Sequence, residues 1–320
     1  KSSGLAASNA VFVGSGPLLF LIVAQYLRAG VAVKAVLETT PRGQYFSSVR
    51  HLPGAIRGWP YLRKGIGLVR AIRRAGVPVH RIDSYAFHGD DRVKTVAAVA
   101  GEARFRIETD SAFVHQGVIP AAQASLSSGC AHDWDEAQLA WRPRIDAAGR
   151  TDKPWLRIAG DCGGIAGAVS ARYAGTIATI GIAADQGLLS VADAEEKARH
   201  PRALLQKDKA VRPFLDSLFR PRLTLTAPQD DETLVCRCEL VSRGDIRAAV
   251  SEGCPGPNQL KAFTRAGMGP CQGRMCGPTV TATMAELTCR PPESVGHYKI
   301  RSPFRPVTVS EIASIVRGGD

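Results

Sequence analysis

Apolar and polar positions at the start of the chain alternate in the manner of a βαβ unit. Residues 10–13 form a short apolar run, a glycine turn follows, and a helical pattern extends from Pro17 to about Arg28. Pro17 suits the first helical turn, where its missing N–H costs nothing. A second apolar run, residues 31–37, ends at Glu38. This order of strand, helix and strand predicts a parallel α/β start.

The rest of the chain carries two further kinds of pattern. In the middle of the chain, the pattern of apolar and polar residues predicts a helix over 61–74 and strands over 77–82, 93–99 and 155–159. It also predicts a small-residue helix from Ile165 to about Gln186 and polar helices over 190–220. After residue 231, short helices over 242–251, 258–264 and 278–287 are expected to alternate with loops rich in glycine and cysteine. These patterns predict an α/β region followed by a smaller helical domain.

Composition narrows the class of protein. The 320 residues are 45% hydrophobic and 22% charged, as in a globular protein of about two domains. No apolar run approaches the roughly 18–20 residues of a membrane-spanning helix, so we expect no such segment. The formal charge of +12 is scattered and aromatic residues make up only 6%. We therefore expect a basic surface that attracts an acidic partner or an anionic cofactor, and no nucleic acid.

Four of the eight cysteines lie within 41 positions near the C-terminus. Cys236 and Cys238 have C-x-C spacing, Cys271 and Cys276 have C-x4-C spacing, and 32 residues separate the pairs. Short cysteine spacings in a cytosolic chain favour metal ligation over disulfides. Each pair precedes a predicted helix, whose first N–H groups can face an anionic cluster. The spacing favours an iron–sulfur cluster, with zinc or inert thiols as the alternatives.

A second candidate site is Gly160-Asp161, at the end of a predicted strand and before the helix start at Gly163, Gly164 and Ile165. A carboxylate in this place accepts hydrogen bonds from hydroxyl groups, and the unpaired N–H groups of a helix start suit an anion. The alternative is an aspartate that only caps an ordinary turn.

A third candidate is the turn Gly14-Ser-Gly16-Pro-Leu-Leu19, with Glu38 located 24 positions after Gly14. The two glycines shape a turn for a pyrophosphate, and the acid suits a ribose hydroxyl. Leu19 stands where the dinucleotide pattern has Gly or Ala. Two hypotheses stay open: bound NAD(P) or another adenine nucleotide, or a fold of the same shape without a nucleotide.

These motifs together resemble a known family. Cys236-Arg-Cys-Glu and Gly267-Met-Gly-Pro-Cys-Gln-Gly-Arg-Met-Cys276 look like the bacterioferritin-associated-ferredoxin-like [2Fe-2S] domain. The variant they resemble is fused to the larger flavin subunit of heteromeric amino-acid and opine dehydrogenases, such as opine oxidase, hydrogen cyanide synthase and D-hydroxyproline dehydrogenase. The likeness extends upstream through Ile158-Ala-Gly-Asp161 to Val13-Gly-Ser-Gly-Pro17, which is nearly the whole chain.

The resemblance implies a fold and a function. The fold is expected to be an α/β, Rossmann-like flavoprotein region with two dinucleotide-binding domains, followed by a small helical [2Fe-2S] domain. Asp161 and the helix start after it are expected to hold FAD, and the four cysteines one [2Fe-2S] cluster. This subunit is then expected to carry electrons between FAD and the cluster in the cytoplasm. Its expected partner is an FAD-containing subunit of the amine- or amino-acid-oxidase type that oxidises the substrate, with a small iron–sulfur subunit as a further candidate partner.

Two other functions stay open, a self-contained NAD(P)H-dependent flavin reductase and a zinc-binding regulatory module. The family order places a flavin-type glycine turn upstream of Gly14, so either the sequence lacks that segment or the Gly14 turn itself serves the flavin. The expected division is residues 1–105 as an NAD(P)-type Rossmann-like domain, 106–220 as the C-terminal part of the FAD domain with a helical extension, 221–231 as a linker, 232–290 as the [2Fe-2S] domain, and 291–320 as an extended tail with a short helix.

Overall fold

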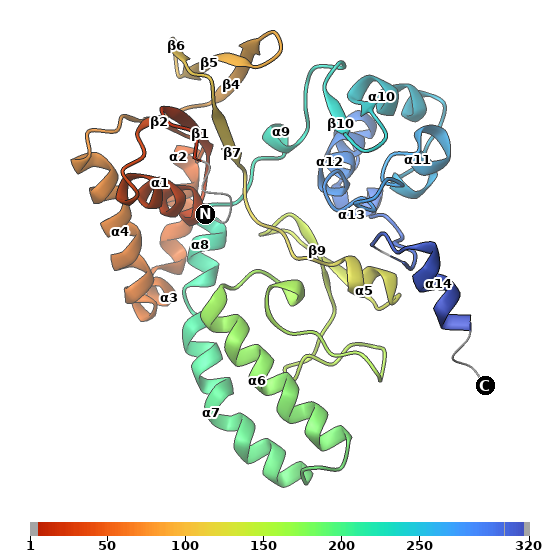
Figure 1. The fold of residues 1–320 in the computed structure, drawn as a ribbon. Coiled ribbons are helices and arrows are strands. Elements are labelled where there is room, and N and C mark those ends of the chain that lie inside the picture. The colour runs from red at the N-terminus through yellow and green to blue at the C-terminus, as the bar shows by residue number, and fades with distance from the viewer. Residues whose placement is uncertain (1–5, 304, 317–320) are drawn as a thin grey trace. The chain divides into compact units, whose positions relative to one another are not determined.

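The computed structural model describes residues 6–303 and 305–316, and these form two compact units (Figure 1). Unit 1 takes its residues from Lys1–Val118 and Arg199–Arg222, and unit 2 from Ile119–Ala198 and Leu223–Asp320. The boundary predicted after residue 105 is wrong, because it falls inside strand β6 (Ala103–Glu108). The chain stays in unit 1 through strand β7 (Ala112–His115), which pairs with the first strand of the protein.

Unit 1 is built on a four-stranded parallel sheet with the order β3-β2-β1-β7. Its strands are β1 (Ala10–Gly14), β2 (Val33–Glu38), β3 (Val79–Arg81) and β7. All of β1 is buried, as a central strand covered on both faces requires. On one face, Phe12 packs with Leu19 and Val23 of helix α1 (Pro17–Arg28) and with Ile72 of helix α4 (Trp59–Arg74). The predicted βαβ start is confirmed.

The other face of the parallel sheet is covered by an antiparallel meander. It consists of β4 (Ser84–Gly89), β5 (Val93–Ala100) and β6, and its Val96 and Ala98 share one core with Val11 and Val13 of β1. Between β2 and β3, the chain also forms α2 (Arg42–Ser48), the 3-10 turn η1 (Val49–His51) and α3 (Leu52–Arg57). Helix α7 (Val191–Lys209) leads to α8 (Arg212–Leu218), which packs against α2 and α3.

The first part of unit 2 holds α5 (Gln123–Ser127), the hairpin of β8 (His132–Asp135) and β9 (Ala140–Pro143), the 3-10 turn η2 (Gly160–Gly163) and helix α6 (Ala168–Asp185). The strand predicted over 155–159 is wrong. The chain turns there, with the Thr151 hydroxyl donating to the Leu156 carbonyl, and only a single bridge joins Arg150 and Arg157. Arg157 is bonded to α6 instead, because its Nε donates to Asp185 at 2.9 Å.

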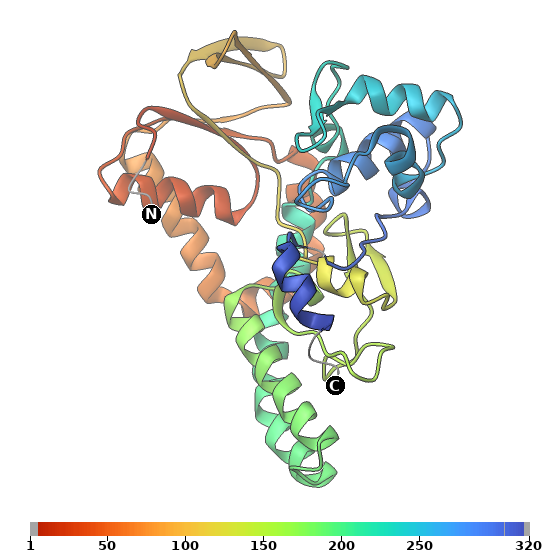
Figure 2. The same cartoon turned by 45° about the vertical axis from the view of Figure 1, so that its right-hand side comes forward.

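The second part of unit 2 contains short helices around a two-stranded ladder, and Figure 2 shows them from a second direction. Helices α10 (Arg243–Ser251), α11 (Pro257–Thr264) and α12 (Gly277–Thr288) match the predicted ones, and β10 (Leu234–Cys236) pairs with β11 (Val241–Ser242). Ser242 and Asp245 form a capping box that fixes the start of α10. The core contains Ile246, Leu260 and Met284.

Two predicted boundaries around this helical part are corrected. The predicted linker contains a helical turn, α9 (Leu223–Thr226), and the predicted tail begins with another, α13 (Pro292–Val295). Tyr298 and Ile300 are buried in the same core as α10–α12, because their apolar side chains fill space beside the cysteine loops. The packed domain thus continues to residue 300. The last predicted helix is present as α14 (Val309–Val316). In the described part of the chain, no helix combines the length and hydrophobicity needed to cross a membrane.

Candidate metal centre and nucleotide-facing loops

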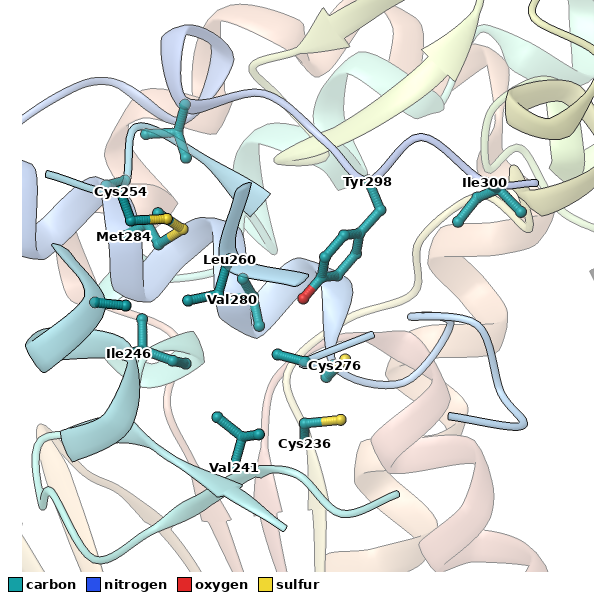
Figure 3. Close-up of a cluster of buried hydrophobic side chains, with 14 residues drawn as sticks. Cys236, Val241, Ile246, Cys254, Leu260, Cys276, Val280, Met284, Tyr298 and Ile300 are labelled. Carbon is teal, nitrogen blue, oxygen red and sulfur yellow. The ribbon is translucent and has the colours of Figure 1, made fainter. Parts of the chain in front are cut away.

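The four predicted cysteine ligands lie on two loops of the helical part of unit 2. Cys236 ends β10 and Cys238 lies in the turn that leads to β11, while Cys271 follows α11 and Cys276 directly precedes α12. Cys236 and Cys276 are only 1% and 3% exposed, whereas Cys238 is exposed and Cys271 half-buried. Figure 3 shows Cys236 and Cys276 beside each other although they come from different loops. The fold therefore brings both predicted pairs together.

The thiols contact one another in two pairs, each of which joins the two loops. Cys276 bonds to Cys236, and Cys238 donates to Cys271. Among residues 6–303 and 305–316, no three His, Cys, Asp or Glu side chains converge on one point suited to a single metal ion. A structural zinc needs four ligands around one ion, whereas a [2Fe-2S] cluster needs two thiolates at each of two irons. The two thiol pairs supply the four thiolates that the two-iron cluster requires.

Burial and hydrogen bonding shift the pKa values of these thiols in opposite directions. Burial, followed by the charge of Cys236, raises the pKa of Cys276 to about 12. Burial also acts to raise the pKa of Cys271, but the Met275 N–H, the Cys238 thiol and the N–H groups of Gly273 and Arg274 outweigh it and lower that pKa. Backbone N–H groups that stabilise a thiolate sulfur are what an anionic cluster requires of its loop.

Glycines in the second cysteine loop, the one that carries Cys271 and Cys276, leave room for the side chains of Cys238 and Tyr298. A Cβ at Gly269 would lie 2.2 Å from the Cβ of Cys238. A Cβ at Gly267 or Gly273 would lie 2.6 or 2.7 Å from the ring of Tyr298. The sequence gives no sign that Tyr298 lies against these glycines, because this residue falls in the stretch expected to be an extended tail.

The second candidate, Asp161, is exposed in η2 and accepts two backbone hydrogen bonds. Its Oδ1 receives the N–H groups of Ala166 and Gly167, each at 3.2 Å. Helix α6 therefore begins at Ala168, three residues later than predicted, after Gly167 with φ +104°. These bonds are those of the capping alternative, and the carboxylate stays accessible at the head of the helix. Its contact with a flavin remains a prediction.

The hairpin β8–β9 holds the loop between Asp161 and α6 through a residue that the sequence pattern does not single out. The Gln138 amide donates to the Ile165 carbonyl at 2.9 Å and accepts from the Ile165 N–H at 3.1 Å. A glutamine at the tip of a hairpin carries no sequence signal for this role, since the two residues are 27 positions apart. The paired bonds fix the backbone at Ile165, one of the predicted flavin contacts.

The third candidate forms the expected turn. Gly14 has φ +141°, and a Cβ there would lie 1.8 Å from the His115 carbonyl oxygen, so only glycine fits. Gly16, with φ +99°, precedes Pro17 at the start of α1. Leu19, the departure from the dinucleotide pattern, is buried in the core at 1% exposure.

Glu38 ends β2 as predicted, but its carboxylate already has partners. The Tyr45 hydroxyl donates to its Oε1 at 3.0 Å, and Arg81 lies 3.9 Å from its Oε2. Burial, followed by the charge of Glu38, raises the pKa of Tyr45, which keeps that hydroxyl a donor. The acid predicted to bind a ribose hydroxyl is therefore engaged inside unit 1.

Comparisons with known proteins show which family this chain resembles. Residues 234–286 match the BFD-like [2Fe-2S] binding domain. The A-type subunit of opine oxidase from Agrobacterium tumefaciens is 39% identical over 317 residues, which cover 98% of this chain and 63% of the relative. The corresponding protein of Rhizobium meliloti (strain 1021) is 39% identical, covering 96% and 67%. Hydrogen cyanide synthase subunit HcnB of Pseudomonas aeruginosa is 28% identical, with the same two coverages.

A solved structure shares the fold. L-proline dehydrogenase from P. horikoshii matches with a TM-score of 0.61 at 17% identity, over 95% of this chain and 49% of that chain. This likeness confirms the predicted fold class, an α/β region followed by a small helical domain. The chain spans about three fifths to two thirds of the length of the curated relatives that it matches. On the identity and coverage of these relatives, the chain belongs to the family of A-type opine oxidase subunits, and its helical part is a BFD-like [2Fe-2S] binding domain.

Proposed function

We propose that this chain is an electron-transfer subunit of a heteromeric amino-acid or opine dehydrogenase, passing electrons between FAD and a [2Fe-2S] cluster. The observation that carries the proposal is the meeting of four thiols from two loops, in two pairs, within a domain of the [2Fe-2S] type. When bound, FAD supplies two-electron exchange and the cluster one-electron exchange, so a chain that holds both converts between the two.

The residues that would hold the cluster are Cys236, Cys238, Cys271 and Cys276. The buried pair, Cys236 and Cys276, keeps water from one side of the site, and the exposed Cys238 leaves the other side open to an electron partner. The N–H groups of the loop after Cys271 stabilise the sulfur of this residue as a thiolate.

The residues that would hold FAD are Gly160, Asp161, Gly163, Gly164 and Ile165. The carboxylate of Asp161 is exposed, and its bonds to two N–H groups orient it at the head of α6. A Cβ at Gly164 would meet only the Arg142 side chain, at 3.9 Å, so the backbone there is open to approach. Hydroxyl groups and a pyrophosphate suit such a helix start. The residues present fit the group.

A second subunit is proposed to dock on the outer face of α2 and α3 and to contain the oxidase-type centre. Residues 39–82 include nine Lys and Arg and no Asp or Glu. Phe46 and Ile56 are 79% and 65% exposed, whereas Ser48 and Ala55 on the opposite side of the helical segment are buried. An apolar face surrounded by positive charge favours a partner surface that carries carboxylates. The eight free thiols favour a reducing compartment such as the cytoplasm for this complex.

The second candidate function is an NAD(P)H-dependent flavin reductase. The turn at Gly14 and Gly16 favours it, because it has the backbone shape that admits a pyrophosphate. The engagement of Glu38 by Tyr45 counts against it, since a ribose would have to displace a partly buried hydrogen bond.

Replacement of each cluster cysteine by serine tests the main proposal. We expect every variant to lose iron, acid-labile sulfide and visible colour, because iron–sulfur sites favour thiolate ligands. Cys289→Ser is the matched control: this thiol is exposed and bonds weakly to the Glu286 carbonyl at 3.8 Å, so its loss should change neither metal nor colour. Zinc without sulfide in the wild-type chain would overturn the proposal in favour of a zinc module. If NADH reduces flavin bound to the purified chain, the result favours the NAD(P)H-dependent reductase instead.

A further inference from the structure

Tyr298 enters the cysteine site from outside the matched [2Fe-2S] domain. The match to that domain ends at residue 286, and the 295–300 segment returns the chain to the same core after α13. Asn258 of α11 holds the segment on both sides of Tyr298: its Nδ2 donates to the His297 carbonyl at 3.0 Å, and its Oδ1 accepts from the Lys299 N–H at 2.7 Å. These bonds fix the position from which the ring enters.

The ring of Tyr298 occupies space that the second cysteine loop keeps clear. Gly267 and Gly273 have φ of +83° and +75°, and a Cβ at either would overlap the ring. A Cβ at Gly277, which follows Cys276, would touch the same ring at 3.5 Å. Three glycines of the loop thus contact one aromatic side chain, which is only 4% exposed. The ring therefore lines one side of the cysteine site.

The hydroxyl of Tyr298 faces the cysteines. Figure 3 shows the hydroxyl end of the ring turned toward Cys276. The oxygen is buried and makes no hydrogen bond within the described part of the chain, and the thiol of Cys276 is the polar group that it faces. A buried hydroxyl without a partner is costly, so a sulfur acceptor accounts for its position.

Lys261 of α11 lies over the same ring. Its Nζ is 5.0 Å from the ring centroid and donates to the Lys299 carbonyl at 2.8 Å, which holds the ammonium in place. A cation over the ring face is attracted by the ring electrons, and its field makes the hydroxyl a stronger donor. The charge also lies close to the cysteine loops.

We infer that Tyr298, with Lys261 on its ring, is a positioning residue that donates a hydrogen bond to the sulfur of Cys276 and raises the reduction potential of the cluster. The inference rests on the proposed function. Reduction adds one electron and hence one negative charge to the iron–sulfur site, and donors to the sulfurs stabilise the more negative state. Without the hydroxyl, the equilibrium shifts toward the oxidised cluster.

The test is a redox titration of the purified chain with dithionite as the electron donor, followed by visible absorption and electron paramagnetic resonance. Tyr298→Phe keeps the ring and removes the hydroxyl. We expect unchanged iron and sulfide, and a reduction equilibrium constant about tenfold lower, which is a potential about 59 mV more negative. Lys261→Met is expected to shift the potential in the same direction. Lys299→Met is the matched control, because it removes the same charge from an exposed side chain, and it should leave the potential unchanged.

The outcomes separate this inference from the proposed function. A Tyr298→Phe chain with full cluster content and the wild-type potential overturns the inference and leaves the function standing. A wild-type chain without iron and sulfide overturns both. If Tyr298→Phe loses the cluster, Lys261→Met decides: a more negative potential supports the inference, and an unchanged one, or a shift equal to that of Lys299→Met, overturns it.

Discussion

Gly269 lies so close to Cys238 that adding one methyl group should displace a cluster ligand. In Gly269→Ala, the new Cβ would be 2.2 Å from the Cβ of Cys238 and 3.2 Å from its Sγ. Carbon atoms in contact prefer about 3.5–4.0 Å. Both Cβ atoms are attached directly to the backbone, so rotation of a side chain cannot relieve the overlap and the two loops must separate. Overpacking of this kind costs about 1–3 kcal/mol.

We expect the upper end of that range, about 3 kcal/mol, which corresponds to a roughly 100-fold weaker hold on the cluster. The assay measures iron and sulfide per chain after reconstitution over a range of iron concentrations, together with thermal unfolding of the metal-free chain. Gly175→Ala is the control, because nothing lies within 4 Å of its added Cβ inside α6. This change should leave iron binding intact and stabilise the fold by about 0.5–1 kcal/mol. Wild-type iron affinity and unfolding temperature in Gly269→Ala would refute the reasoning.

Three further predictions concern other parts of the chain. Asp161→Ala removes the acceptor for two N–H groups before α6, so the chain should lose about 1 kcal/mol in thermal unfolding and retain FAD less well; unchanged values would make the carboxylate dispensable. The hydrogen bond from Arg157, opposed only in part by desolvation, lowers the pKa of Asp185 from its ordinary 3.8. The stabilisation that Asp185 provides is therefore present above that value and lost as pH falls through the lowered pKa. In a plot of unfolding temperature against pH, Asp185→Asn should make the decrease at acid pH less steep. An equally steep decrease in the variant would contradict this. Ile56→Asp on the exposed face of α3 should release the partner subunit in native mass spectrometry while the isolated chain keeps its unfolding temperature, and an intact complex would remove this face from the interface.

Local signals in the sequence were sufficient for elements that depend on near neighbours. The helix α10 begins where Ser242 and Asp245 can cap it, and α1 begins at Pro17 after a glycine turn. Such signals act within about four residues, so they do not depend on the rest of the fold. The spacing of Cys236 and Cys238 before one helix is of the same kind. The candidate ligands, the βαβ start and the three helices of the C-terminal domain could all be predicted for this reason.

The strand predicted over 155–159 shows where local signals are insufficient. Its apolar residues suit a strand, but a strand needs a neighbour to pair with, and only one bridge forms. In the same way, β7 belongs to the first sheet because it pairs with β1, about one hundred positions earlier. Pairing partners are chosen by the burial of the whole sheet, so the boundary expected after residue 105 could not be corrected from the sequence.

The side chains that complete each candidate site were decided by tertiary structure alone. Tyr298 reaches Cys276 because Asn258 anchors the returning chain and glycines clear its path. Glu38 has the sequence position of a ribose ligand, yet Arg81 of β3 lies beside its carboxylate and Tyr45 donates to it once the chain has folded. Residue type and spacing thus determined which chemistry the chain can support. Which groups surround it depended on segments far apart in the sequence, because burial and close packing, unlike helix capping, are properties of the assembled fold.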